Sequence, residues 1–261
     1  MESSRGWLLN INLLFTCHNI KEHRPTNKEQ GNLFFILGGN MKIYFDLDDT
    51  LYRLYDPFYK AYQEVFLKEI DIYQLWKKSR IYNNEIYSQY LNKQITKDEL
   101  AIYRLKKAFK DFNIDISNQQ ALKFQKVYEY QQAHISLSSI MKEVFTYLKE
   151  KKVTYGILTN GKEQAQISKI KSLFEIIDFP VIISDKVGYQ KPQKEIFDLI
   201  KDEETYYVGD GYEIDMIGAS QAGIKTIWYN HQHLKKDTSF IDYVVYSDEE
   251  LLNVIKKLNN D

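Results

Sequence analysis

Cysteine is nearly absent from this sequence, and neither sign of charge predominates. Among 261 residues there is one cysteine, Cys17, so no disulfide can form within the chain and a reducing, cytoplasmic compartment is expected. Lysine and arginine number 35, against 36 for aspartate and glutamate, which gives a net charge of −1. Nucleic acid and anionic membrane surfaces bind basic faces, so this balance disfavours both. The expected partner is a small molecule, and the chain is expected to be a monomer or a homodimer.

A hydrophobic run long enough to cross a bilayer is also missing. The candidate targeting segment, WLLNINLLF at residues 7–15, is far shorter than the roughly 20 residues that a membrane span needs, and two asparagines interrupt it. No small-residue cleavage site follows, which argues against a secretory signal. Because the first forty residues have no regular pattern, we expect residues 1–40 to be a non-native or disordered extension and Met41 to be the true start.

From Lys42 onward, short strand patterns alternate with helical ones. Strands are predicted at residues 42–46, 153–159, 180–184, 205–210 and 225–230, and amphipathic helical patterns separate them, among them residues 192–201 and 213–223. Strands that alternate with helices form parallel sheets covered on both faces. The predicted fold class is therefore α/β, with a doubly wound parallel-sheet core.

The first two predicted strands are separated by about a hundred residues, where a simple crossover needs a few tens at most. The excess is helical in pattern, and Thr96 and Glu99 have the spacing of a capping box. We therefore expect an inserted all-helical cap at residues 56–136. Residues 41–55 and 137–261 would form the α/β core.

Acidic and polar side chains follow three of the predicted strands. The first strand runs into MKIYFDLDDTLY, where three carboxylates crowd together and would repel one another unless a cation or hydrogen bonds held them. In chain order, the residues that follow the three strands are Asp46 and Asp48, then Thr159, Asn160 and Gly161, then Asp210 and Asp215. Ligands of open α/β sheets bind at the carboxyl ends of the strands, so a site is expected there.

These residue types suit phosphoryl transfer. Asp46 could attack a phosphate if Mg²⁺, held by oxygen ligands such as Asp46 and Asp210, neutralised the repulsion. An acid two residues later, Asp48, emerges on the same side of an extended chain and could protonate the leaving alcohol. Thr159 can donate a hydrogen bond to the phosphoryl oxygens, and Lys191, just before Pro192, can supply a point charge.

Four short motifs, DLDDT, TNG, KP and GDGYEID, occur in this order and in this strand context. They resemble the motifs of the haloacid dehalogenase (HAD) superfamily of phosphatases, in the subgroup with a helical cap. The resemblance implies Mg²⁺ as cofactor and a phosphoaspartyl intermediate. The roles it implies are nucleophile for Asp46, acid/base with a main-chain carbonyl on Mg²⁺ for Asp48, phosphate ligands for Thr159 and Lys191, metal ligand for Asp210 and further metal carboxylate for Asp215.

A narrower resemblance, to bacterial pyrimidine 5'-nucleotidases, makes nucleoside 5'-monophosphates the leading substrate class. Asn160 is a further candidate phosphate ligand or only shapes its turn. Tyr55 and Phe58 belong to an aromatic stripe that either stacks on a nucleobase or packs in the cap. Arg53 either contacts substrate or lies on the surface.

Other functions remain open from the sequence. A sugar-phosphate or phosphoglycolate-type phosphatase would use the same motifs. A 2-haloacid dehalogenase would need neither Mg²⁺ nor the acid at Asp48, so Asp48 and Asp210 argue against it. A non-catalytic phospho-acceptor signalling module must leave its acidic face open to partners, and the expected cap disfavours that.

Overall fold

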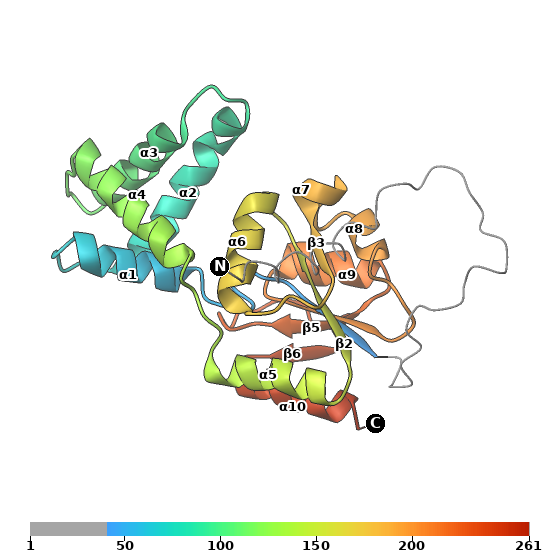
Figure 1. Ribbon diagram of the computed structural model, residues 1–261. Coiled ribbons are helices and arrows are strands. Elements are labelled where there is room, and N and C mark those ends of the chain that lie inside the picture. Colours follow the sequence, from blue (N-terminus) through green and yellow to red (C-terminus); the bar gives the residue numbers. More distant parts are fainter. Residues whose placement is uncertain (1–40, 261) are drawn as a thin grey trace, which may run out of the picture. The chain divides into compact units, whose positions relative to one another are not determined.

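The computed structural model describes residues 41–260, which contain a six-stranded parallel sheet (Figure 1). The expectations for residues 1–40 lie outside the described residues. The strand order is β3-β2-β1-β4-β5-β6, and every neighbouring pair is parallel. The strands are β1 (Lys42–Phe45), β2 (Thr154–Thr159), β3 (Val181–Ile183), β4 (Thr205–Gly209), β5 (Lys225–Tyr229) and β6 (Tyr243–Val245). The first strand among the described residues is thus a central one.

Both faces of the sheet are covered, as the doubly wound fold class predicts. Along β1, Ile43 and Phe45 lie in one hydrophobic cluster and Tyr44 lies in another, because successive side chains of a strand point to opposite faces. The first cluster receives α5 (Ser139–Glu150), α6 (Glu163–Leu173) and α10 (Asp248–Leu258). The second receives α8 (Lys194–Asp198), a π-helical turn (Tyr212–Met216) and α9 (Ile217–Gln221).

A helical insertion separates β1 from β2, as expected. Its helices are α1 (Tyr55–Val65), α2 (Ile72–Leu91), α3 (Lys97–Lys110) and α4 (Asn118–Gln132). They enclose a hydrophobic cluster of their own, in which the rings of Phe58 and Phe124 lie 4.9 Å apart. The capping box at the start of α3 is present, because Thr96 accepts from the backbone of Glu99 and Glu99 accepts from that of Thr96. We keep 56–136 as the proposed bounds of this cap.

Several element boundaries differ from the sequence prediction. The five predicted strands begin and end within one residue of their positions, but β6 was missed because three residues are too few to show alternation. The helix expected to open at Pro192 begins at Lys194, since Gln193 is still extended as its N-cap. The helix expected over 213–223 is divided between the π-helical turn and α9. The short helix α7 (Ser184–Val187) had no sequence signal.

Within residues 41–260, no helix has both the length and the apolar composition that crossing a membrane would require.

Candidate active site

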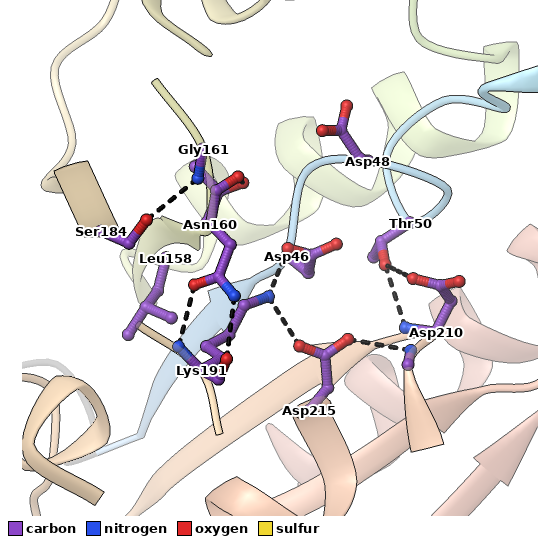
Figure 2. Close-up of polar contacts among 12 residues, drawn as sticks. Asp46, Asp48, Thr50, Leu158, Asn160, Gly161, Ser184, Lys191, Asp210 and Asp215 are labelled. Carbon is purple, nitrogen blue, oxygen red and sulfur yellow. Dashed lines mark hydrogen bonds and ion pairs between the residues drawn. The ribbon is translucent and has the colours of Figure 1, made fainter. Parts of the chain in front are cut away.

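Three carboxylates meet at the carboxyl edge of the sheet (Figure 2). Asp46 directly follows β1, Asp210 directly follows β4, and Asp215 lies in the π-helical turn that comes next. Since β1 and β4 are paired neighbours, the residues that follow them emerge side by side. One carboxylate oxygen from each of the three aspartates lies within 4.8 Å of the others.

The ammonium group of Lys191 neutralises part of this cluster. Its Nζ lies 2.5 Å from Oδ1 of Asp46, 2.6 Å from Oδ1 of Asp215 and 2.8 Å from the hydroxyl of Tyr207. An ammonium has three hydrogens, and these partners use all of them. Burial alone would lower the pKa of Lys191, but the two carboxylates more than offset this and hold it above its usual range. Lys191 is therefore a fixed positive charge inside the site.

One positive charge does not balance three carboxylates, and the pKa values of Asp46 and Asp210 reflect this. Burial raises the pKa of Asp46 to about 7, with Lys191 opposing the shift and Asp215 adding to it. Burial and the carboxylate of Asp46 raise the pKa of Asp210 to about 8. A set of oxygen donors with excess negative charge suits a hard cation such as Mg²⁺. Asp46, Asp210 and Asp215 would hold it.

Asp215 is held tightly from the backbone side. Its Oδ2 accepts from the amide of Gly211 at 2.9 Å. A Cβ at Gly209 would lie 2.6 Å from the same oxygen, so only glycine lets β4 approach this carboxylate so closely. Thr50 links Asp210 to the first motif, because its hydroxyl accepts from the amide of Asp210 at 3.1 Å. These bonds set the carboxylate positions before any cation binds.

The carboxylate of Asp48 lies outside this cluster. Figure 2 shows it pointing away from Asp46 and Asp210. Nζ of Lys169 lies 2.8 Å from both of its oxygens, and the hydroxyl of Tyr52 and the amide of Gln166 also donate to it. Although burial acts to raise the pKa of Asp48, Lys169 and these hydrogen bonds lower it below its usual value. Its side chain is bound to α6 and not to the other carboxylates.

The turn after β2 holds Lys191 in place. The amide of Asn160 accepts from the backbone N–H of Lys191 at 2.9 Å and donates to its carbonyl at 3.0 Å. Asn160 thereby clamps the lysine backbone through both its Oδ1 and its Nδ2. Thr159 is buried, and its hydroxyl accepts from Gln166 at 2.8 Å. Gly161 has a φ of +140°, which favours glycine, and it donates to Ser184.

The three candidate contacts of the leaving group lie in different surroundings. The ring of Phe58 is only 1% exposed inside the cap cluster, which is the packed arrangement of the two alternatives, and a contact with a nucleobase stays a prediction. Arg53 donates to the carbonyl of Asp49 and to the hydroxyl of Tyr229, which occupies both terminal nitrogens. Tyr55 is half-buried among aromatic rings of the cap and remains a candidate.

Some polar residues of the site were not found from the sequence. They are Thr50, Tyr52, Gln166, Lys169 and Tyr207. Gln166 and Lys169 lie three residues apart on the helix that follows TNG, a spacing that puts both on one helix face. That spacing was available in the sequence, but nothing in it showed which face of α6 meets the site.

A doubly wound sheet with an aspartate nucleophile candidate at its carboxyl edge and a helical insertion after its first strand defines a class of hydrolases. The chain belongs to that class as a haloacid dehalogenase-like hydrolase, since the model of this family matches residues 43–229. The solved structure of the HAD-hydrolase YfnB from Bacillus subtilis, bound to magnesium, has the same fold. The two superpose with a TM-score of 0.60 at 21% identity, over 82% of this chain and 98% of that one.

Two curated relatives differ in how much of the chain they match. The pyrimidine 5'-nucleotidase PynA of Streptococcus pneumoniae is 28% identical over 231 residues, which cover 82% of this chain and 94% of that protein. The glyceraldehyde 3-phosphate phosphatase of Pyrococcus furiosus is 35% identical over 140 residues. That match covers 44% of this chain and spans little more than half of the relative, 58%.

Proposed function

We propose that this protein is a Mg²⁺-dependent phosphatase that hydrolyses small phosphate monoesters through a phosphoaspartyl intermediate on Asp46. The observation that carries the proposal is the position of Asp46, paired with Lys191 and grouped with Asp210 and Asp215 at the carboxyl edge of the sheet. Family membership supports hydrolysis as the reaction class. When bound, Mg²⁺ would supply the positive charge that lets a carboxylate approach a phosphate dianion.

In the first half of the reaction, a carboxylate oxygen of Asp46 forms a bond to phosphorus while the bond from phosphorus to the ester oxygen breaks. Asp48 is ionised beside Lys169, so it would first turn away and take up a proton from solvent, and would then give that proton to the departing alkoxide. In the second half, Asp48 would take a proton from water, whose oxygen attacks phosphorus. The bond to Asp46 then breaks, and inorganic phosphate and the original carboxylate remain.

The other residues bind and orient the phosphoryl group. Lys191 supplies a positive charge that stays in place because Asp215, Tyr207 and the Asn160 clamp hold it. Thr159 would donate its hydroxyl hydrogen to a phosphoryl oxygen. Asp48 would have to turn from Lys169 toward the leaving group. Closure of the helical cap over the substrate would exclude bulk water from the intermediate.

Pyrimidine nucleoside 5'-monophosphates are the leading substrate class. Every substrate shares the phosphate, so the cap has to read the leaving group. The match to the nucleotidase PynA covers 231 residues and therefore includes much of the insertion. The match to the glyceraldehyde 3-phosphate phosphatase covers 140 residues and need not include the insertion. Tyr55, on the first helix of the cap, offers an aromatic edge for a base. A triose phosphate or another sugar phosphate is the alternative within the same chemistry.

Two rivals need less of the site than it contains. A dehalogenase needs no cation, and the carboxylates of Asp210 and Asp215 would then only repel Asp46. A phospho-acceptor switch needs the nucleophile and cation but no acid at Asp48. We keep the cytoplasm as the proposed compartment because the chain has a single cysteine.

The test is phosphate release from a panel of nucleoside monophosphates and sugar phosphates, in Mg²⁺ and in EDTA, with Asp46→Asn alongside. We expect release that requires Mg²⁺ and disappears in the variant. The ratio between pyrimidine, purine and sugar substrates decides the substrate class. A folded wild-type chain that releases no phosphate from any ester would refute the phosphatase proposal.

A further inference from the structure

A buried glutamine on α6 contacts two proposed catalytic-site residues, the phosphate ligand Thr159 and the acid/base Asp48. Nε2 of Gln166, a residue only 2% exposed, lies 2.8 Å from Oγ1 of Thr159 and 3.2 Å from Oδ2 of Asp48. It also lies 2.8 Å from the carbonyl oxygen of Asn160. The carbonyl and the carboxylate can only accept hydrogen bonds. The amide must therefore present its nitrogen here, so Gln166 is a donor to Thr159.

This donor decides where the hydrogen of Thr159 can point. A hydroxyl has one hydrogen and two lone pairs, and Gln166 occupies a lone pair. Among the described residues, the acceptor left for the hydrogen is the carbonyl of Asn160 at 3.4 Å, which is long for an O–H···O bond. That carbonyl also accepts from Gln166 at the shorter distance. The hydroxyl hydrogen is thus weakly held and available to a stronger acceptor, such as a phosphoryl oxygen.

The backbone after β2 leaves room for the glutamine. A Cβ at Gly161 would lie 3.1 Å from both Cδ and Nε2 of Gln166. Nine in ten real Cβ contacts are looser than this, so a side chain at Gly161 would press on the amide. The turn and the helix that follows it therefore fit together around the amide of Gln166.

We propose that Gln166 is a positioning residue that directs the hydroxyl hydrogen of Thr159 toward the transferring phosphoryl group. The inference rests on the proposed phosphatase function and adds a residue to its phosphate-binding side. The amide has two hydrogens for three acceptors, and Asp48 is the most distant of them. Gln166 can therefore release Asp48 during turnover and still hold Thr159.

Two substitutions separate this role from simple packing. Gln166→Met keeps the volume and removes the donor, and it should lower kcat/KM roughly tenfold, the scale of one lost hydrogen bond. Gln166→Glu also keeps the volume, but its carboxylate accepts, so Thr159 would turn its hydrogen onto Glu and away from the phosphate. The Glu variant should therefore be impaired more than the Met variant.

The same two substitutions are then made in a protein that carries Thr159→Val, a change that removes the hydroxyl and keeps the shape of the side chain. If Gln166 acts through that hydroxyl, both substitutions should change kcat/KM by less than about twofold in the valine background. Equal losses of kcat/KM with and without the Thr159 hydroxyl would overturn the proposal, because losses caused by general repulsion or altered packing do not depend on that hydroxyl. A Glu variant no worse than the Met variant would overturn it as well.

The same double-mutant cycle, Gln166 substitutions with and without Thr159→Val, is also measured on the Kd of inorganic phosphate by calorimetry in Mg²⁺. This measurement does not require turnover. A wild-type chain that binds phosphate but hydrolyses no ester would refute the proposed function, and the coupling in Kd would still decide the role of Gln166. Gln164→Met, an exposed glutamine on the same helix, is the matched control and should change nothing. Failure of both Gln166 variants to fold, with Thr159→Val folded, would assign Gln166 to structure instead.

Discussion

The Nζ atom of Lys191 lies 2.5 Å from Oδ1 of Asp46, the proposed nucleophile, and both side chains are buried. In this position the lysine offsets repulsion among the carboxylates and also faces the place where a phosphoryl group would bind. A buried charge that loses its partner is strongly destabilising. The pair therefore links the stability of the fold to its chemistry.

Lys191→Met is expected to abolish turnover and to destabilise the metal-free protein by about 3–5 kcal/mol, since it leaves Asp46 and Asp215 without their cation. Mg²⁺ should restore more stability to this variant than to the wild type. Urea unfolding with Mg²⁺ and with EDTA measures both effects. Lys194→Met breaks an exposed pair with Asp198 and should shift stability by no more than about 0.5 kcal/mol. Equal Mg²⁺ responses in wild type and Lys191→Met would contradict the prediction.

The metal-free protein should become less stable as the pH rises from about 4 to about 8. An unfolded aspartate titrates near pH 4, whereas folded Asp210 keeps its proton up to about pH 8. The folded chain then binds more protons across this window. Linkage makes the free energy of unfolding fall with rising pH there, and the contribution is full below the unfolded pKa. Each tenfold difference in proton affinity corresponds to about 1.4 kcal/mol.

Asp210→Asn isolates that effect from the titration of other groups. In EDTA, its unfolding free energy should depend less on pH than that of the wild type and should exceed it at pH 9. The same variant should lose its Mg²⁺-induced thermal shift. Parallel pH curves for the two proteins in EDTA would show that Asp210 is ionised in the folded state at ordinary pH.

Asp48→Asn should reduce turnover most for substrates whose leaving groups need a proton in order to depart. Turnover of a nucleoside monophosphate should fall by roughly 10²–10⁴-fold, the usual contribution of general acid–base catalysis. Release of p-nitrophenol from p-nitrophenyl phosphate should fall less in the first half-reaction, because that leaving group departs without protonation. Burst kinetics measure this step separately. The same loss for both substrates in that step would mean that Asp48 only supports the structure.

Gly209→Ala should displace the carboxylate of Asp215 and weaken Mg²⁺ binding at least tenfold, because the added Cβ would lie 2.6 Å from Oδ2. Calorimetric titration with Mg²⁺ measures the effect. Gly188→Ala is the control, since its Cβ would meet nothing within 4 Å, although its φ of +81° costs some stability. Unchanged Mg²⁺ affinity in Gly209→Ala would show that the close approach is not needed.

Much of the fold could be predicted from the sequence, because burial imposes local patterns. Strands such as Lys42–Phe45 are short apolar runs bounded by polar residues, and the length between β1 and β2 alone required an insertion. Edge strand β6 and helix α7 were missed because three or four residues carry no periodicity. The π-helical turn at Tyr212–Met216 carries Asp215, whose contact with Lys191 joins distant parts of the chain and is not encoded by any local pattern.

The candidate site could be predicted only where strand order brings residues together. The grouping of Asp46 and Asp210 follows from adjacent parallel strands. The partners of Asp48 do not, because Lys169 reaches it from a helix whose rotation depends on packing against the sheet. A similar limit applies to Phe58, whose stripe left both stacking on a base and packing in the cap open. A helical stripe shows that a face is apolar, but it does not show whether solvent or another helix covers that face.

Of the six strands, β1 is synthesised first, yet the two strands that pair with it, β2 and β4, come much later in the chain. Ile43 pairs with Tyr155 and with Tyr206, so the centre of the sheet cannot assemble until most of the chain has left the ribosome. The insertion can fold earlier, since its helices pack on one another. Because Phe58 of α1 contacts Phe124 of α4, the folded insertion brings its two ends together. It thereby shortens the loop that β1 and β2 must close, and we expect it to act as the chain's first folding unit.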